Sequence, residues 1–295
     1  MTLPQLLTTR EIAQLLRIKE RKVYELAADN TLPVLRVTGK LLFPLELVEQ
    51  WLKAHIEYAP TRPRLHTRPK VVSGSHDPLL EWALRESATD VANIFEGSSV
   101  GLERFARGEA IMAGMHLYDV ASDSWNIAAI RQKLPGADVA LVEFAKRRQG
   151  LMMLPSTSVQ PTQICEIGDR RFIQRQSGAG AQILFDVLRT RAGLPTQSLT
   201  YCAEPARSEM EVGLAISDGR ADIGFGVEAV ARQLRLDFAP LVEEDFDLLV
   251  WRKNYFDTAI QQFLKFCRGD AFATRAASFG GYDISTLGRV KYNAP

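Results

Sequence analysis

The sequence contains few of the residues that most often carry covalent or metal chemistry. Only three of its 295 residues are cysteines, and they are Cys165, Cys202 and Cys267. An odd number of widely separated cysteines, without a CxxC pair or a Cys/His cluster, indicates neither a disulfide framework nor a zinc site. We therefore predict that the protein binds no metal and needs no cofactor.

Recognisable catalytic motifs are also missing. The chain has no GxSxG elbow, no HExxH motif and no phosphate-binding P-loop. His116, Asp119 and Cys165 could be drawn as a triad, but no motif supports that arrangement. His55 lies in an amphipathic segment and His66 in a proline-rich one, where structural or solvated roles are expected. We predict a binding protein and not an enzyme.

A third absence concerns membranes. No segment approaches the roughly 20 consecutive apolar residues that span a bilayer. The N-terminus also lacks the basic start and apolar run of a secretory signal. We expect a cytoplasmic protein without a membrane partner.

The net charge of +1 conceals an asymmetry between two parts of the chain. Residues 1–70 contain 12 Lys and Arg against 7 Asp and Glu, a balance of +5, and the remaining residues contain 24 against 28, a balance of −4. A basic segment joined to a mildly acidic one is typical of a nucleic-acid-binding module attached to a domain that does not contact nucleic acid.

The basic segment has the local signals of a helix-turn-helix. Thr8 and Glu11 form a capping box that starts a first helix. The short break after it allows only a tight turn before a second helix at residues 20–29. Two β-rich runs around Gly39 then predict a hairpin, and Pro44 suits the first turn of a closing amphipathic helix. The second helix leaves one face free.

This free face carries basic and hydroxyl side chains that can neutralise phosphates or bond to guanine in a major groove. Basic residues on a helix are often no more than a solvated face, but the hairpin adds further basic residues as a wing. The residues that we predict to contact DNA are Lys19, Arg21, Lys22, Tyr24, Arg36, Thr38 and Lys40.

Three pieces follow one another here in a specific order: TTREIAQLLRIKERKVYEL, LPVLRVTGKLLFP and a closing helix with a Trp. In order and spacing they resemble the excisionase-type winged helix, which is related to the mercury-resistance-regulator fold. The resemblance covers about the first fifty residues. It implies binding to double-stranded DNA, with residues 19–24 at the major groove and the hairpin at residues 36–40 at the backbone or minor groove.

Residues 58–70 contain several prolines and basic residues and predict a semi-rigid linker. This linker would join a winged helix-turn-helix domain at residues 1–57 to a second domain at residues 71–295. The second domain alternates strand-like and helix-like pieces, which is typical of an α/β fold with a largely parallel sheet. A second set of such units at about residues 155–240 favours two lobes.

Within the second domain the pattern predicts several separate elements. We expect one strand at residues 139–144 and another at residues 150–154. A single last helix is expected at about residues 256–272.

Three loops of the second domain share one feature, because in each a short strand runs into a turn with glycine and serine that opens a helix. They are residues 73–77, 97–101 and 176–180. A helix N-terminus offers unpaired amides and about half a positive charge, so it can hold a small anion. Any one of these turns could be a plain N-cap. Three in one domain favour a ligand site at the carboxyl ends of the strands.

The segments VVSGSHDPLLEWAL, FEGSSVGLERFARGEAIMAGMHLYD, RRFIQRQSGAGAQILFDVL, SDGRADIGFGVEAVA and GGYDISTLGRV occur in this order. They resemble a family of periplasmic-binding-protein-like (type 2) domains, described as molybdate-binding-like, whose members are fused to this kind of winged helix. The resemblance implies a bacterial one-component regulator with ligand held between two lobes. The implied ligand-binding residues are Ser73, Ser75, His76, Ser98, Ser99, His116, Arg175, Ser177, Gly178 and Glu228.

The sequence departs from the family at one important loop. The family commonly has Gly-Ser-Gly-Thr-Arg where this chain has Gly178-Ala179-Gly180-Ala181-Gln182, so two hydroxyls and one basic residue are absent. The resemblance implies a molybdate- or tungstate-type oxyanion. A small carboxylate such as formate remains open, with Arg175 as its partner.

Together these observations predict a DNA-binding transcriptional regulator controlled by a small anion. We expect a homodimer or a higher homo-oligomer on a DNA operator, because one small module makes few contacts and symmetry doubles them. The alternative is an excisionase-like architectural protein that binds DNA and senses no ligand.

Overall fold

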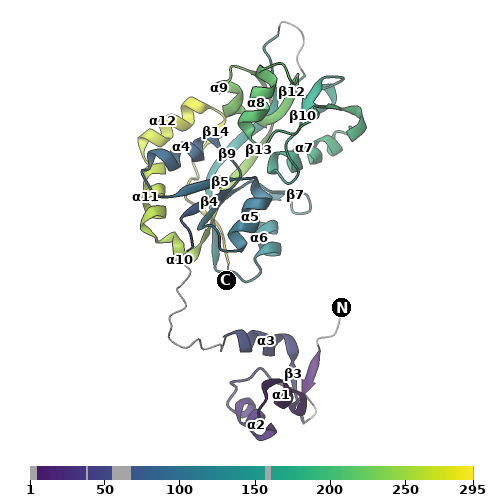
Figure 1. The fold of residues 1–295 in the computed structure, drawn as a ribbon, viewed down its shortest axis with the longest axis vertical. Coiled ribbons are helices and arrows are strands. Elements are labelled where there is room, and N and C mark those ends of the chain that lie inside the picture. The colour runs from purple at the N-terminus through teal and green to yellow at the C-terminus, as the bar shows by residue number, and fades with distance from the viewer. Residues whose placement is uncertain (1–4, 38, 55–67, 157–160, 295) are drawn as a thin grey trace. The chain divides into compact units, whose positions relative to one another are not determined.

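The computed structural model describes residues 5–37, 39–54, 68–156 and 161–294, with only the backbone of residues 53 and 54. Within it the chain forms two compact units, Met1–Thr67 and Arg68–Pro295 (Figure 1). Thr38, His55, His66 and most of the predicted linker lie outside the described residues.

The N-terminal unit is a helix-turn-helix with a small antiparallel sheet of order β1-β3-β2. Thr8 caps the first helix, and the reciprocal bonds with Glu11 confirm the predicted capping box. Strand β1 was not predicted, and it pairs with β3 along Leu6–Thr8. The elements are β1 (Leu6–Thr8), α1 (Thr9–Leu16), α2 (Glu20–Ala28), β2 (Leu35–Val37), β3 (Lys40–Pro44) and α3 (Leu45–Ala54).

A small apolar core holds this unit together. Ile12 from α1, Val23 from α2 and Phe43 from β3 are fully buried and belong to one cluster. The predicted hairpin is confirmed by the β2–β3 register, in which Val37 pairs with Lys40. Residues of α2 that point away from this core are exposed.

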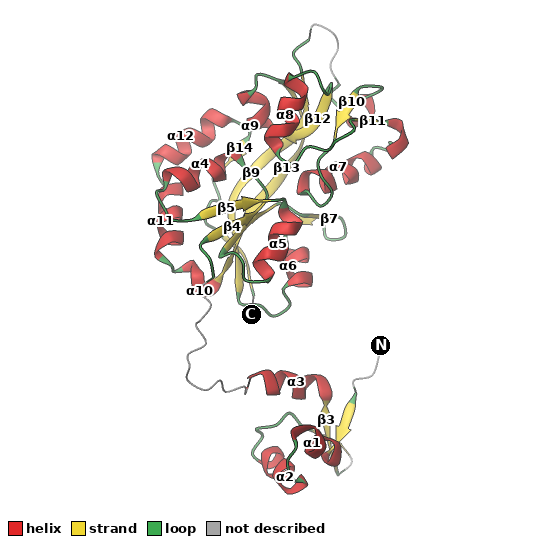
Figure 2. Ribbon diagram, in the orientation of Figure 1, coloured by secondary structure: helices red, strands yellow, loops and turns green. Residues whose placement is uncertain are grey.

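The second unit is built on one sheet of ten strands that passes through two lobes (Figure 2). Its main path has the order β11-β10-β12-β9-β13-β6-β4-β5, and β14 and β15 pair with β9 off this path. The strands are β4 (Val71–Gly74), β5 (Ala92–Phe95), β6 (Met112–Met115), β9 (Val139–Met153), β10 (Arg171–Ile173), β11 (Thr200–Tyr201), β12 (Ile223–Val227), β13 (Asp237–Trp251), β14 (Tyr282–Asp283) and β15 (Val290–Asn293), and a separate hairpin pairs β7 (Tyr118–Asp119) with β8 (Ser124–Trp125).

Helices cover both faces of this sheet. In the first lobe, around β4, β5 and β6, helix α4 packs with α11 and α12 while α5 packs with α6. The second lobe, around β10, β11 and β12, is covered by α7, α8 and α9 (Figure 1). The helices are α4 (Pro78–Glu86), α5 (Ser98–Ala106), α6 (Ile127–Lys133), α7 (Gly180–Arg191), α8 (Glu209–Ser217), α9 (Glu228–Gln233), α10 (Arg252–Tyr255), α11 (Thr258–Cys267) and α12 (Asp270–Phe279), with 3-10 turns at Ile164–Glu166 and Thr196–Ser198.

The expected pair of strands at residues 139–144 and 150–154 is wrong, because β9 is one strand of 15 residues. The polar run from Lys146 to Gln149 resembles a loop in the sequence, yet it stays in the sheet. Arg147 and Gln149 are buried at this point, and β13 of equal length pairs with β9 throughout. These two strands join the lobes and form the hinge.

The expected single last helix at residues 256–272 is also wrong. Two helices, α11 and α12, occupy this region and extend to Phe279. Gly269 separates them as the N-cap of α12, with an extended conformation that ends the helical path. As a result α12 is placed against both α4 and α9.

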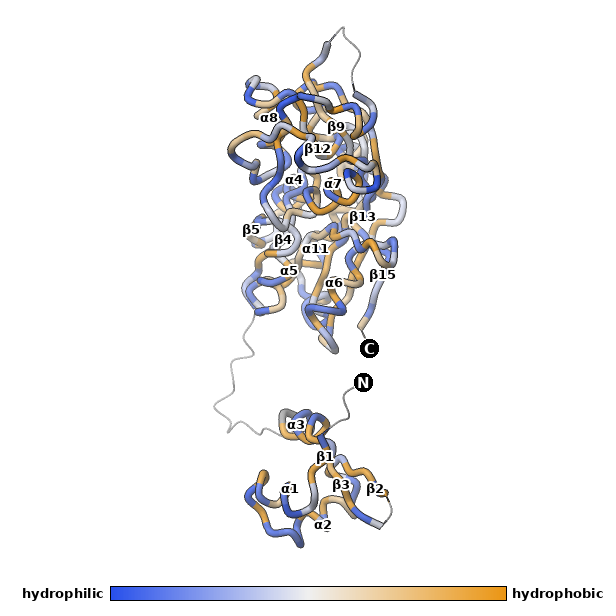
Figure 3. Tube along the Cα trace, turned by 90° about the vertical axis from the view of Figure 1, so that its right-hand side faces the viewer, coloured by the Kyte–Doolittle hydropathy of each residue, from blue (hydrophilic) through white to orange (hydrophobic). Residues whose placement is uncertain are grey.

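Hydrophobic and hydrophilic residues alternate along both units, as the colours of Figure 3 show. None of the helices in the described ranges is long and apolar enough to cross a membrane. Among the same residues, no group of three or more His, Cys, Asp or Glu side chains is placed to hold a metal ion.

Candidate functional site

Two helix N-termini from different lobes lie close together in the second unit. An ideal Cβ on Gly97, the N-cap of α5, would lie 3.6 Å from the Cα of Ala179, the N-cap of α7. One on Gly178 would lie 3.7 Å from the Cβ of Ser99. Neither helix has a side-chain cap, so the first amides of both helices are not satisfied by capping side chains. The positive ends of two helix dipoles therefore lie in the same region, which favours an anion there.

His116 lies where these two loops meet. Its Nε2 is 2.9 Å from the Oγ of Ser75, and its backbone amide donates to the Oγ of Ser98 over 3.2 Å. Gly180 allows α7 to approach, because an ideal Cβ at that position would lie 2.7 Å from Cε1 of His116. The structure therefore brings together Ser75, Ser98 and His116 from the first lobe with the start of α7.

A buried network of charges continues from His116 into the hinge strands. Nδ1 of His116 lies 2.7 Å from Oε2 of Glu244 in β13, and the other oxygen of Glu244 accepts a short bond from Arg147 in β9. Arg147 also donates to Asp77 over 2.9 Å, and the hydroxyl of Tyr282 donates to the same oxygen over 2.7 Å. Because Asp77 caps α4, the network ties the hinge to the first lobe.

Arg147 and Glu244 hold each other in the ionised state. Burial alone would raise the pKa of Glu244, but the charges of Arg147 and His116 lower it to about 2. Burial alone would likewise lower the pKa of Arg147, and the charges of Glu244 and Asp77 raise it well above its usual value. The arginine is thus neutralised internally and is not free to bind a ligand.

Asn126 fixes the segment that carries His116. Its Oδ1 accepts from the amide of Leu117 over 2.6 Å, and its Nδ2 donates to Asp247 over 2.6 Å. Burial raises the pKa of Asp247 to about 6, although Lys291 and Asn126 act in the opposite direction. Asp247 is therefore a second titratable group that helps to position His116, because it bonds to Asn126.

Several predicted ligand residues have other neighbours. The Oγ of Ser73 donates to the carbonyl of Gly101 over 3.0 Å, which ties β4 to α5 inside the first lobe. Arg175 is buried and its guanidinium bonds to Glu209, so the fork assigned to a carboxylate ligand is used within the second lobe. Ser177 is exposed and lines a separate pocket with Arg175.

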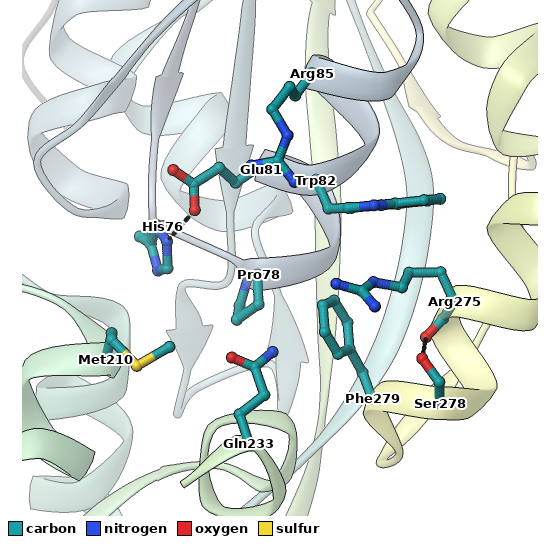
Figure 4. Close-up of a pocket in the computed structure, with 10 residues that line it drawn as sticks. All are labelled: His76, Pro78, Glu81, Trp82, Arg85, Met210, Gln233, Arg275, Ser278 and Phe279. Atoms are coloured by element: carbon teal, nitrogen blue, oxygen red, sulfur yellow. Dashed lines mark hydrogen bonds and ion pairs between the residues drawn. The ribbon is translucent and has the colours of Figure 1, made fainter.

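His76 and Glu228 are also placed away from His116. The Nε2 of His76 lies 3.0 Å from Glu81 of α4, at a pocket between the lobes that Figure 4 shows. Glu228 pairs with Arg148 over 2.8 Å and with Arg232 over 2.7 Å at the hinge. The predicted residues that gather at the α5 and α7 termini are thus Ser75, Ser98, Ser99, His116 and Gly178.

The predicted DNA-contacting residues form an exposed face of the N-terminal unit. Lys19, Arg21, Lys22 and Tyr24 are all exposed, with 53% of Tyr24 accessible, and Lys40 is exposed on the hairpin. Arg21 and Lys22 pair loosely with Glu25, and the Arg21 side chain remains 91% exposed. Arg36 differs, since its Nη2 donates to the Ala27 carbonyl near the end of α2 over 2.7 Å and so has a role within the unit.

The sequence analysis did not identify Arg147, Glu244, Gln149 and Tyr282. Their one signal in the sequence is charge and polarity beside strand-like runs, and residues 146–149 lie outside both of the strands expected there. Gln149 is fully buried, and its side-chain amide is one of the groups that lower the pKa of Glu244. Only the three-dimensional pairing of β9 with β13 places Arg147 beside Glu244, which contacts His116.

Comparisons with known proteins agree with this architecture. A family model described as the PBP superfamily domain matches residues 81–268, and one described as a helix-turn-helix domain matches residues 6–55. An uncharacterized protein of Bacillus subtilis (strain 168), YvgK, is 23% identical over 303 aligned positions, which cover 96% of each chain.

Solved structures similar to the second unit share its fold. A candidate phosphate ABC transporter substrate-binding protein from Clostridium perfringens, with bound phosphate, matches with a TM-score of 0.53 and 15% identity, over 75% of this chain and 99% of its own. The CcmR regulatory domain of Synechocystis PCC6803 in complex with 2-PG matches with a TM-score of 0.50 and 13% identity, over 66% of this chain and 92% of its own. PhnD1 from Prochlorococcus marinus (MIT 9301) in complex with methylphosphonate matches with a TM-score of 0.50 and 9% identity, over 75% of this chain and 92% of its own.

Proposed function

Because the chain belongs to the PBP superfamily and also carries a helix-turn-helix domain, we propose that it is a ligand-responsive transcriptional regulator. The N-terminal unit binds a double-stranded DNA operator through α2 and the β2–β3 hairpin. The second unit binds a small anion between its lobes. The protein acts by binding and not by catalysis.

The observation that carries the anion proposal is the approach of the α5 and α7 N-termini across the cleft. Both termini present amide donors without side-chain caps, and Ser98 and Ser99 add hydroxyls beside them. Ser75 and His116 complete one wall through their 2.9 Å contact. Since Arg147 and Arg175 are each paired with carboxylates, and both ring nitrogens of His116 contact Ser75 and Glu244, the donors for the anion are amides and hydroxyls.

Tetrahedral oxyanions are the first ligand class to consider. Phosphate and methylphosphonate are the ligands named for two structures with this fold. Molybdate and tungstate have the same tetrahedral shape, and they are the effectors that the family resemblance favours. Ala179 and Ala181 replace hydroxyl residues at the start of α7, so a smaller carboxylate such as formate is the alternative.

The direct test is thermal unfolding of the purified protein with molybdate, tungstate, phosphate, sulfate, formate and other small carboxylates. A ligand at about 100 times its dissociation constant adds roughly 2.7 kcal/mol and raises the melting midpoint. We expect a selective increase with one of these anions. Ser98→Ala should reduce the increase, whereas Ser198→Ala, an exposed serine outside the site, should not.

Coupling to DNA is the second part of the test. The affinity for the operator should change in the presence of the stabilising anion. The change can be no larger than the difference between the anion's affinities for the open and the closed arrangement of the lobes. A homodimer reading two half-sites should shift DNA mobility in one cooperative step. If no anion stabilises ligand-free protein and DNA binding is unaffected, the architectural DNA-binding alternative replaces the sensor.

A further inference from the structure

The pocket beside His76 has a volume of about 550 Å³ and lies between the lobes, and His116 is not among the residues that line it. Helix α4 of the first lobe forms one side with Trp82, and α12 forms another with Arg275 and Phe279. Met210 of α8 and Gln233 of α9 face them from the second lobe (Figure 4). This volume is within the range of pockets that hold small organic ligands.

Of the two arginines that line this pocket, Arg85 pairs with Glu86, whereas Arg275 pairs with no carboxylate among the described residues. Figure 4 shows its side chain extending from α12 between the rings of Trp82 and Phe279. Its Cζ lies 4.3 Å from the centroid of Phe279 and 5.5 Å from that of Trp82. Within the described residues its guanidinium has no carboxylate within ion-pair distance and no hydrogen-bond acceptor, and its Nε is buried without a partner. A cation held in this way is available to an anionic group.

Two other charged side chains line the pocket, and each has a partner: Glu81 lies 3.0 Å from Nε2 of His76, and Arg85 pairs with Glu86. The remaining lining residues are apolar or neutral. Trp82, Phe279 and Met210 offer ring faces and a thioether, which favour a flat apolar body. Gln233 supplies an amide at the floor of the pocket. A bare inorganic anion would leave these surfaces unused, whereas a ring bearing one carboxylate would use both the cation and the apolar walls.

From this chemistry we infer that the pocket is a second ligand site, which binds an aromatic carboxylic acid. The carboxylate bonds to Arg275, and the ring packs on Trp82, Phe279 and Met210. Because these contacts come from both lobes, the ligand stabilises their closed arrangement. His76, whose ring lines this pocket, directly follows Ser75, so occupancy can be transmitted to the anion site.

The experiment uses the full-length protein and titrates it with benzoate, phenylacetate and the uncharged analogue benzamide. Binding is measured by calorimetry and by the fluorescence of Trp82, which Trp82→Phe identifies among the four tryptophans. Loss of a charge-assisted bond should weaken benzoate or phenylacetate binding in Arg275→Gln by about tenfold or more. Benzamide has no carboxylate, so its affinity for the wild type should be no higher than the affinity of the two acids for Arg275→Gln.

The controls separate this site from the anion site. Arg131→Gln removes another guanidinium over an aromatic ring, Tyr292 at 5.5 Å, and should leave aromatic-acid binding unchanged. Ser98→Ala should weaken small-anion binding only, and Arg275→Gln aromatic-acid binding only. If the melting midpoint of Arg275→Gln is lowered, Arg275→Lys, which keeps the charge but loses the fork, provides the comparison.

Three results would overturn the inference. One is that neither acid binds saturably at millimolar concentration to the wild type. Another is equal affinity in the wild type and in both Arg275 variants. The last is loss of aromatic-acid binding in Ser98→Ala, which would place these acids at His116. The first two results leave the binding of the small anion untested, and the melting scan with small anions tests the proposed function separately.

Discussion

On α2 of the N-terminal unit the basic side chains are exposed, and Arg21 and Lys22 are held only by loose contacts with Glu25. In the second unit Arg147 and Arg175 are 1% and 5% exposed, and each is bound to buried carboxylates. The first arrangement leaves charge available for a polyanion such as DNA. The second pairs each arginine with carboxylates inside the fold, so that the proposed anion there must be bound by amides and hydroxyls. The same residue type thus serves opposite purposes in the two units.

Replacing Arg147 by Met should have the largest effect, because it leaves Asp77 and Glu244 buried without a counter-charge. Removing one partner from a buried ion pair is expected to lower the free energy of unfolding of the second unit by about 3–5 kcal/mol. Chemical denaturation followed by far-UV circular dichroism measures the change. Arg171→Gln breaks an exposed pair with Asp222 and should cost less than about 1 kcal/mol. Equal losses in the two variants would remove the distinction between buried and exposed charge.

Asp247 provides a test with pH. Its pKa in the folded protein, about 6, lies above the usual 3.8, so the folded state binds a proton more readily than the unfolded state between these values. Stability should therefore fall as pH rises from about 4 to about 6, by up to about 3 kcal/mol. Asp247→Asn should remove this part of the pH dependence while keeping an acceptor for Asn126. A variant with the same pH profile as the wild type would show that Asp247 ionises normally.

The exposed side of the comparison is tested by Arg21→Ala combined with Lys22→Ala. If both side chains contact phosphates, DNA affinity should fall and the slope of log affinity against log salt should decrease by about 2. Fluorescence anisotropy with a labelled operator at several salt concentrations measures both. The fold should remain intact because both side chains are exposed. An unchanged slope would exclude α2 from the DNA interface.

The smallest effect is expected at the start of α1. Thr8→Ala removes the side-chain half of a capping box and should lower the stability of the N-terminal unit by about 1 kcal/mol. Thermal unfolding of this unit, followed by NMR signals of its residues or by the fluorescence of Trp51, would detect the loss of stability. Thr9→Ala, one position later, changes the same residue type without touching the cap and is the matched control. A loss as large as that in Arg147→Met would contradict the small role assigned to local surface bonds.

Features that depend on residues close together in the chain could be predicted from the sequence. The capping box of Thr8 and Glu11 and the β2–β3 hairpin depend on neighbours in the chain, and both are confirmed. The meeting of Ser98 with His116 followed from a general rule, because loops at the carboxyl ends of neighbouring parallel strands lie together.

The parts that could not be predicted depend on long-range register. Arg147 lies directly opposite Glu244 only because β9 and β13 pair over their whole length. Nothing near either residue in the sequence indicates that partner, and a polar run such as residues 146–149 is more typical of a loop. Similarly, no local signal places Arg275 between Trp82 and Phe279, since Trp82 lies on a helix almost 200 residues away.

The length of β9 has a consequence for how the second unit comes apart. Residues near its start pair with β15 and β13, and residues near its end pair with β12 and β13, so one strand supplies backbone partners to both lobes. Neither lobe can lose its sheet without exposing the ladder of the other. We expect the two lobes to melt as one cooperative block, and limited proteolysis to release this block whole and never a single lobe.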